Sequence, residues 1–289
     1  LGGEISIETR RDLAREAFTH TAEYDAVISA YLAGRQGLSP EFLDSSVLPF
    51  RKVSALRYGE NPHQSAALYS EAGAEGASLA TAPLVLGAAV SFNNVLDGEA
   101  AWDCVLEFDE PACVIIKHNN PCGVAVDSAL AEAYNRAREC DPVSAFGSVI
   151  AVNRPLDRDT ALAMKSNFIE LLLAPSYDED ALEILKEKKD IRAIEMGDVA
   201  GPRALGKDFR RIRGGMLAQE YDTDPYDRAS WKVATGTVPT DAQWEDLLFA
   251  WKVCKHVKSN AIVLAKDRAT VGVGAGQMSR VDSVKKIGR

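Results

Sequence analysis

The sequence predicts an α/β protein, because short apolar segments rich in β-branched residues alternate along the chain with amphipathic helical segments. The order is clearest in residues 112–152, where the strand-like segments ACVIIK and GSVIAV flank the helical segment SALAEAYNRARECD. The composition agrees: 46% of the 289 residues are hydrophobic and 26% are charged, as in an ordinary globular protein that can bury a sizeable core.

A long helix is the first predicted element, over residues 8–33, since apolar side chains recur there at helical spacing. Thr9 is the expected N-cap, and Gly34 and Gly37 supply a stop. This helix reads as a connector that leads into a new domain. The opening LGGEISIETRRDL begins without Met and the chain stops after SVKKIGR, so we expect a fragment of a longer protein, cut at both ends.

The next block predicts a first lobe of mixed type. Its predicted helices carry regularly spaced polar residues. Its predicted strands are short, continuous apolar runs. Helices are predicted at 97–108, 128–141 and 178–189, and strands at 112–117, 147–152 and 168–175. Residues 196–230 are rich in Gly, Pro and charge, so we expect a long connection with little regular structure.

A second lobe is predicted from residue 231 onward. WKVAT (231–235) and SNAIVLAKD (259–267) read as strands, and 240–257 reads as an amphipathic helix capped by Thr240 or Asp241. ATVGVGAGQMSR then reads as a strand, a glycine turn and a helix start. Both lobes share the order helix, apolar strand, polar turn and helix, which hints at a duplicated α/β unit.

Charge and cysteine usage exclude several classes of protein. The net charge of −9 and the pI of about 5.1 argue against a nucleic-acid partner, although a few placed cations could still bind a small anion. The five cysteines form no C-x-x-C pair, so we expect reduced, mostly buried thiols in a cytoplasmic protein. The sequence contains neither a secretory signal pattern nor an apolar run of the ~18–20 residues that a membrane span needs.

The stretch LRYGENPHQ, at residues 56–64, gathers polar side chains around a glycine and a proline. Arg57 and Tyr58 could present a guanidinium and a hydroxyl to a phosphate. The alternative is a polar turn, and for His63 alone a local hydrogen bond is the preferred interpretation.

The stretch VIIKHNNPCGVA, at 114–125, runs from apolar residues directly into Lys117 and His118. A histidine beside a cation favours its neutral form and can act as a base, while a lysine can stabilise an oxyanion or protonate a leaving nitrogen. A solvent-exposed lysine and a histidine packed in a turn is the competing interpretation, and these residues alone do not decide. Neighbouring side chains on a strand point to opposite faces, so a shared site requires the strand to end at or before Lys117.

Two other motifs each allow more than one interpretation. The PCG sequence suggests a zinc deaminase, but the chain contains no H-x-E motif and Ala125 stands where the second cysteine of P-C-x-x-C would be. A catalytic zinc is therefore not expected. GVGAGQMSR, at 272–280, could offer backbone N–H groups to an anion or a carboxylate beside Ser279 and Arg280, or could simply be a tight turn.

Together, five motifs in order resemble one family: RYGENPHQ, KHNNPCG, CDPVSAFGSVIAVN, SNAIVLAK and GVGAGQMSR. They are similar to the AICAR transformylase domain of the bifunctional AICAR transformylase/IMP cyclohydrolase family, where AICAR is aminoimidazole carboxamide ribonucleotide. The resemblance implies two cytidine-deaminase-like α/β lobes without zinc, preceded by a long connector helix. The implied domains are the end of the cyclohydrolase domain with a linker (1–34), the first lobe (35–195), the inter-lobe connection (196–230) and an incomplete second lobe (231–289).

The resemblance also implies the reaction and its residues. The formyl group of N10-formyltetrahydrofolate, a cosubstrate, passes to the 5-amino group of AICAR in purine biosynthesis, without a catalytic metal. The implied roles, by similarity, fall into three groups. These are catalysis by Lys117, His118 and Asn260; AICAR binding by Arg57, Tyr58, Asn94, Glu170 and Lys189; and folate binding by Val143, Phe146, Ser279 and Arg280.

The family further implies a homodimer with active sites at the subunit interface, and no nucleic-acid or membrane partner. No IMP cyclohydrolase activity is expected of this chain, because the resemblance does not extend to that active site. Two alternatives remain open: a nucleotide- or folate-binding remnant without turnover, and a zinc-dependent deaminase or hydrolase.

Overall fold

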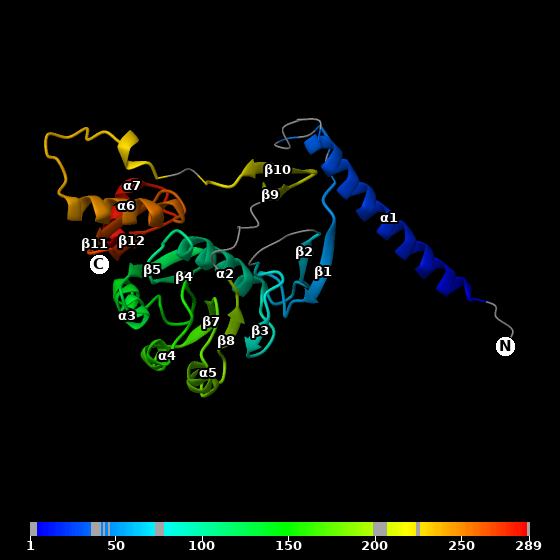
Figure 1. Ribbon diagram of the computed structural model, residues 1–289, viewed down its shortest axis with the longest axis horizontal. Coiled ribbons are helices and arrows are strands. Elements are labelled where there is room, and N and C mark those ends of the chain that lie inside the picture. Colours follow the sequence, from blue (N-terminus) through cyan, green and yellow to red (C-terminus); the bar gives the residue numbers. More distant parts are fainter. Residues whose placement is uncertain are drawn as a thin grey trace. The chain divides into compact units, whose positions relative to one another are not determined.

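The computed structural model describes residues 5–35, 42, 44–45, 47–72, 78–198, 207–223 and 226–287 (Figure 1). These residues form two compact units, which we describe separately. The smaller unit holds the first helix, most of one two-stranded sheet and a hairpin, whereas the larger unit holds an eight-stranded sheet and all the other helices.

The smaller unit begins with α1 (Ile7–Arg35), which confirms the predicted long helix. Thr9 was the wrong N-cap: the hydroxyl of Ser6 accepts the backbone N–H of Thr9 at 3.1 Å, so the helix starts one turn earlier. The helix continues through Gly34 to Arg35, and Gly37 lies outside the described residues. Strands β1 (Phe50–Ala55) and β2 (Ala67–Glu71) form the two-stranded sheet.

A β-hairpin corrects the expectation of little regular structure in residues 196–230. Strands β9 (Lys207–Ile212) and β10 (Gly215–Glu220) pair antiparallel in continuous register. Gly214, with a φ of 78°, lies in the turn between them and takes a left-handed conformation that glycine adopts without a steric penalty. The strand expected at WKVAT was also wrong, because residues 231–234 belong to no strand.

The larger unit is built on one sheet of eight strands in the order β11-β12-β5-β4-β6-β7-β8-β3. Every residue of the central strands β4, β6 and β7 is buried except Lys117 and Glu170, as expected for apolar runs covered on both faces. The bounds are β3 (Leu84–Leu86), β4 (Ala112–Lys117), β5 (Asn120–Val126), β6 (Ser148–Val152), β7 (Ile169–Ala174), β8 (Arg192–Glu195), β11 (Ile262–Lys266) and β12 (Ala269–Gly274). The predicted strands at 112–117, 147–152 and 168–175 are thus confirmed.

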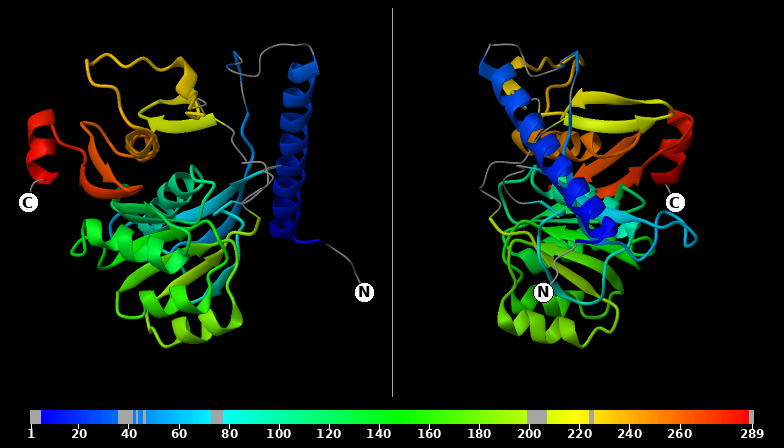
Figure 2. Two further views of the ribbon diagram at one scale, coloured as in Figure 1. Left: turned by 60° about the vertical axis from the view of Figure 1, so that its left-hand side comes forward. Right: turned by 90° about the vertical axis from the view of Figure 1, so that its right-hand side faces the viewer.

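Helices cover both faces of this sheet, which gives a three-layer α/β structure and confirms the predicted class (Figures 1 and 2). Alternate residues of β4 show the division: Ile115 packs toward one face, and Val114 and Ile116 pack toward the other. The first face is covered by α3 (Leu130–Cys140), α4 (Arg158–Met164) and α5 (Glu179–Lys186), and the second by α2 (Phe92–Val105) and α6 (Asp241–Lys255). The last helix, α7 (Arg280–Ile287), packs on β12.

The sheet contains two copies of one α-β-β-α unit. The first copy is α2, β4, β5 and α3, and the second is α6, β11, β12 and α7. Each copy opens with a capping box, from Ser91 and Asn94 in one and from Thr240 and Gln243 in the other. The same order of elements therefore recurs, as the hypothesis of a duplicated unit predicted, and Thr240 is the N-cap of α6.

The two copies share the sheet rather than forming separate sheets. Strand β12 pairs with β5 through Ala269 and Ala125, and the Thr270 hydroxyl bonds both the N–H and the carbonyl of Val124, at 2.9 and 3.2 Å. The expected domain boundaries stay predictions. No helix among the described residues is long and apolar enough to cross a membrane, and all five cysteines are free thiols.

Candidate functional site

The predicted catalytic pair lies where β4 ends: Lys117 is the last residue of β4, and His118 is the first residue of the two-residue turn before β5. Strand β4 ends at Lys117 and β5 starts at Asn120, as the shared-site hypothesis required. His118 and Asn119 have φ values of 53° and 59°, which is the left-handed pair of a type I′ hairpin turn. Because the strand stops at Lys117, the alternation of faces no longer separates the two side chains.

The ammonium of Lys117 is held in place by the loop that precedes β6. Its Nζ donates a hydrogen bond of 2.8 Å to the carbonyl oxygen of Phe146, which lies just before β6. Strand β6 pairs with β4, so this bond is made at the end of the sheet where β4 terminates. The lysine therefore points toward a neighbouring loop rather than freely into solvent.

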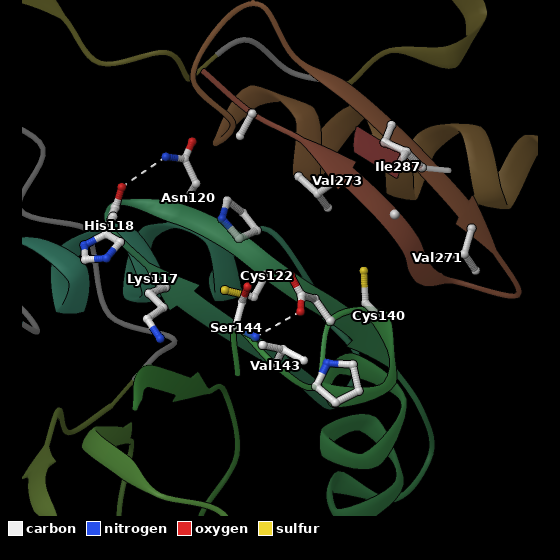
Figure 3. Close-up of a pocket in the computed structure, with 15 residues that line it drawn as sticks. Lys117, His118, Asn120, Cys122, Cys140, Val143, Ser144, Val271, Val273 and Ile287 are labelled. Carbon is white, nitrogen blue, oxygen red and sulfur yellow. Dashed lines mark hydrogen bonds between the residues drawn. The ribbon is translucent and has the colours of Figure 1, made fainter. Parts of the chain in front are cut away.

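A cavity of about 740 Å³ lies beside this turn. In Figure 3, Lys117 and His118 stand at one end of it, and Val271, Val273 and Ile287 line the opposite side. Further lining comes from the loop after α3 and from the first residues of β5; these residues are Asn120, Pro121, Cys122, Cys140, Asp141, Pro142, Val143 and Ser144. A volume of this size is typical of small-molecule sites.

A carboxylate cluster lies next to the turn, on α2 and β7. The amide Nδ2 of Asn94 donates to Glu170 Oε2 at 2.8 Å, so these two predicted AICAR-binding residues are in direct contact. Asp97 accepts the backbone N–H groups of His118 and Asn119, at 3.2 and 2.6 Å. Burial raises the pKa of Asp97 above its usual value, and nearby Glu170 adds to the shift, whereas the two N–H groups and His118 oppose it.

The loop with Arg57 and Tyr58 is attached to the start of α2. The N–H of Phe92 donates to the carbonyl of Tyr58 at 3.4 Å, and the N–H of Arg57 donates to the carbonyl of Val90 at 3.5 Å. The Arg57 guanidinium lies over the Tyr58 ring, 5.6 Å from its centroid, and is itself exposed. This places a cation near the helix that carries Asn94.

The three predicted residues of the second copy also lie together. Asn260 Nδ2 donates to the carbonyls of Gln277 and Met278, at 3.0 and 3.1 Å, directly before Ser279 and Arg280. Ser279 caps the start of α7: its hydroxyl accepts the N–H of Asp282 at 3.1 Å. The predicted helix start is confirmed at Arg280.

Asn120 joins the Asn260 loop to the catalytic turn. Its Oδ1 accepts the N–H of Lys258 at 3.1 Å, and its Nδ2 donates to the carbonyl of His118 at 3.0 Å. One side chain therefore fixes the turn of the first copy relative to the loop of the second. The carbonyl of Lys258 in turn accepts the N–H of Gly276 in the glycine turn, at 2.8 Å.

The predicted folate-binding residues Val143 and Phe146 lie in the loop between α3 and β6, and Val143 lines the cavity. Val143 is 85% exposed and Phe146 is 60% exposed, although both are large and apolar. The ring of Phe146 lies 5.4 Å from the ring of Phe168. Exposed apolar groups beside a polar cluster are typical of a binding site for a flat, partly apolar ligand.

Lys189 was predicted to bind AICAR, but no hydrogen bond or ion pair among the described residues connects it to the other predicted AICAR-binding residues. It is exposed and lies shortly before β8, while neighbouring Lys188 bonds three backbone carbonyls nearby. Arg192 is the better-connected cation at this end of the sheet. Its guanidinium donates to the carbonyl oxygens of Ala89 and Glu170, at 3.2 and 3.4 Å.

Asp97, Asn120 and Arg192 are the candidates that the sequence did not predict. Asp97 and Asn120 act on backbone groups, and a backbone partner leaves no pattern in the sequence. Arg192 begins a strand of four residues that was itself not predicted. One signal was available: the order helix, strand, turn recurs in both copies, and Asp246 stands in α6 where Asp97 stands in α2.

The imidazole, ammonium and carboxylate groups gathered here are of the kind that can support acid–base and oxyanion chemistry. Among the described residues, no three His, Cys, Asp or Glu side chains are grouped so that they could hold a metal ion. Burial raises the pKa of Cys122 to about 12, so this thiol in the cavity wall stays protonated and is a poor nucleophile. The ionisable groups near the turn are the His118 imidazole, the Lys117 ammonium, and the carboxylates of Asp97 and Glu170.

A family model and a curated relative both match nearly the whole chain, and both describe the same kind of bifunctional enzyme. Residues 2–288 match the family model described as the AICARFT/IMPCHase bienzyme. The chain is 52% identical over 285 residues to the bifunctional purine biosynthesis protein PurH of Persephonella marina. The match covers 98% of this chain and 55% of that protein, so the chain spans about half the length of the relative.

Proposed function

Because the chain belongs to the AICARFT/IMPCHase bienzyme family, a family of purine-biosynthesis enzymes, we propose that its activity is the formyl transfer. The formyl group comes from N10-formyltetrahydrofolate and passes to the 5-amino group of AICAR. The observation that carries the proposal is the turn after β4, which presents Lys117 and His118 together at one end of the cavity.

The reaction needs help at two points. The amine of AICAR is a poor nucleophile, because its lone pair is delocalised into the imidazole carboxamide, and the formyl oxygen becomes negative as the amine adds. In the proposed mechanism His118 accepts the proton that the amine loses. Lys117 stabilises the oxyanion and gives a proton to the N10 nitrogen of folate as the C–N bond breaks.

The remaining residues supply binding in this proposal. Arg57 and Tyr58 hold the phosphate, while Asn94 and Glu170 hydrogen-bond the nucleotide, with Lys189 as a further phosphate contact. Asn260 orients the formyl or carboxamide group. The exposed side chains of Val143 and Phe146 receive the pterin, with Ser279 and Arg280 at its polar end.

The quaternary structure in this proposal is a homodimer with the sites at the subunit interface. Light scattering on the purified chain measures the mass directly. Mixing the Lys117→Ala variant with the Asn260→Ala variant then tests for shared sites. Activity that reappears on mixing two inactive variants shows that the two residues meet across subunits.

The central test is formyl transfer by single variants. Lys117→Ala and His118→Ala should each lower kcat by about 100-fold or more, since general acid–base and oxyanion groups contribute on that order. AICAR binding, measured by calorimetry, should be largely retained. Near-normal turnover in either variant removes that residue from the catalytic role.

The chain supplies a matched control. Lys266 ends β11 as Lys117 ends β4, and it too is followed by a two-residue left-handed turn, but the proposal gives it no part in the reaction. Lys266→Gln should therefore leave kcat unchanged, whereas Lys117→Gln should lower it.

A nucleotide- or folate-binding protein without turnover is the second candidate function. Binding of AICAR and of a folate analogue without product formation would favour it. No cyclisation of formyl-AICAR to IMP is predicted for this chain, and an assay of IMP formation tests that prediction directly.

A further inference from the structure

Two carboxylates in the larger unit occupy equivalent places and make equivalent bonds. Asp97 on α2 accepts the backbone N–H groups of His118 and Asn119, at 3.2 and 2.6 Å. Asp246 on α6 accepts those of Asp267 and Arg268, at 3.0 and 2.7 Å. In each copy one carboxylate therefore holds both residues of the turn that follows the first strand.

These turns need such support. All four turn residues have φ between 52° and 59°, and none is glycine. A left-handed backbone is costly for a residue with a Cβ atom, and a run of two such residues persists only where the surroundings hold it. A carboxylate that accepts both amides satisfies two donors which the hairpin itself leaves without a strand partner.

The copies differ in what the turn presents. The first turn carries His118 beside the cavity, whereas the second carries Asp267 and Arg268 and contacts a guanidinium of the scaffold instead: Arg136 donates to the Asp267 carbonyl. The same backbone contact therefore occurs once at the cavity that Lys117 and His118 line, and once at a second cavity, of about 720 Å³, that Asp246, Lys266 and Asp267 line.

We propose that Asp97 is the positioning residue of the active site: it fixes the left-handed turn that aims the His118 imidazole at the reacting amine. This role rests on the proposed formyl transfer. Asp97 itself does not exchange a proton with the substrate; it acts through the two amides. Asp246 makes the same contact at a turn that carries neither member of the predicted catalytic pair, so it is the control.

The test compares Asp97→Asn with Asp246→Asn in the full chain. An asparagine keeps one acceptor oxygen and turns an NH₂ group toward the second amide. Both variants should lose similar stability, but only Asp97→Asn should lower kcat for formyl transfer, on the order of 10–100-fold, because a misplaced catalytic group costs about that much. The KM for AICAR should change little.

A rescue variant separates positioning from proton transfer. Asn119→Gly places glycine, the residue that best tolerates a left-handed backbone, at the second turn position. Combined with Asp97→Asn, it should restore at least part of the lost kcat. A proton-transfer role for Asp97 predicts no rescue, so an unrescued double variant overturns the proposal, as does Asp97→Asn with normal kcat.

Amide hydrogen exchange gives a readout that needs no activity. Exchange at His118 and Asn119 should accelerate in Asp97→Asn and stay slow in Asp246→Asn, while Asp267 and Arg268 show the reverse. Unchanged exchange at His118 and Asn119 overturns the positioning role. If the unmodified chain transfers no formyl group, the proposed function fails, and the exchange result still decides whether Asp97 holds the turn.

Discussion

The two copies have the same backbone conformation at the turn after their first strand, so they differ there in their side chains. Lys117 and Lys266 both end a strand, and both are followed by two left-handed residues. His118 and Asp267 then occupy the same turn position. The difference in expected activity therefore lies in the side chains and in the neighbours that only the first copy has, such as the Phe146 carbonyl.

Asn94 is expected to contribute more to stability than its counterpart in the second copy. Both Asn94 and Gln243 complete capping boxes, but only Asn94 also donates to a carboxylate, that of Glu170. Asn94→Ala should cost about 1.5–3 kcal/mol more than Gln243→Ala in urea denaturation, the usual range for one hydrogen bond to a charged group. Equal losses would show that the Glu170 bond contributes nothing.

The residues that the sequence identified are those with an unusual side chain in an unusual place. Lys117 and His118 stand out because they interrupt an apolar run. Asp97 does not stand out, since an aspartate on a helix surface is ordinary until the turn that it holds is seen. Contacts made to backbone groups are thus the part of a site that side-chain patterns miss.

At the scale of elements, the sequence predicted the buried strands and the long helices well. Strands β4, β6 and β7 are continuous apolar runs, because both of their faces are covered. Strand β5 was missed, since Asn120 and Pro121 at its start resemble a loop. The exposed hairpin β9–β10 was missed as well, because it has no buried face to impose an alternating pattern.

WKVAT shows the opposite error. Its β-branched and aromatic residues suit a strand, but a strand exists only where a partner accepts its hydrogen bonds. The aromatic side chain packs elsewhere: the ring of Trp231 lies 6.3 Å from that of Trp244 and 5.4 Å from that of Trp251.

Helix α3 packs so closely on β5 that only glycine, which has no Cβ atom, can occupy position 123 without a clash. A Cβ atom on Gly123 would overlap the carbonyl oxygen of Ala137, which belongs to the backbone of α3 and cannot move alone. At the equivalent Gly272, a Cβ atom would meet the side chain of Ile287 instead, which can rotate.

A graded series of alanine variants tests this packing. Gly123→Ala should lower the free energy of unfolding by about 3 kcal/mol or more, and Gly272→Ala by less, because overpacking against backbone is the costlier case. Gly236→Ala is the control, since nothing lies within 4 Å of the place that its Cβ atom would take. Equal effects of Gly123→Ala and Gly272→Ala in thermal denaturation would contradict this account.

At the scale of the whole larger unit, a buried ionic group ties the two copies together. The Glu107 carboxylate, after α2, accepts hydrogen bonds from Lys255 at 2.9 Å and from Tyr226 at 2.9 Å, and lies 3.2 Å from His256 Nε2. Burial by itself raises the pKa of Glu107, but these partners, His256 first, lower it to about 2.

The Glu107 contacts predict an acid-sensitive stability. A carboxylate whose pKa is lowered on folding stabilises the protein above its unfolded pKa, near 4.5, and that stabilisation is lost as the pH falls toward 2. The stability advantage of the unmodified chain over Glu107→Gln should therefore be full at pH 6 and shrink between about pH 5 and pH 2.

The exposed pair of Glu110 and Arg268, 2.8 Å apart, provides the control for this measurement. Glu110→Gln should change stability by about 0–1 kcal/mol, because solvent and salt screen exposed pairs. A Glu107→Gln difference that does not vary with pH would show that the carboxylate is not charged in the folded protein.

The arrangement of the copies lay beyond the sequence. The recurring order of helix, strand, turn and helix suggested two lobes, and each copy in the structure has that order with one further strand after the turn. Whether two such units form two sheets or one depends on a few contacts between β12 and β5, above all those of Thr270. Nothing in the sequence around Thr270 distinguishes that hydroxyl from any other.

The duplicated unit also bears on how the chain folds. Each copy contains a hairpin whose strands are joined by a two-residue turn, β4–β5 within residues 92–140 and β11–β12 within residues 241–287, with helices packed on it. Local contacts of this kind form early, whereas the pairing of β12 with β5 must close a long loop first. Refolding should therefore show a fast phase that orders both hairpins and a slower phase that joins them, with Thr270→Val slowing only the second.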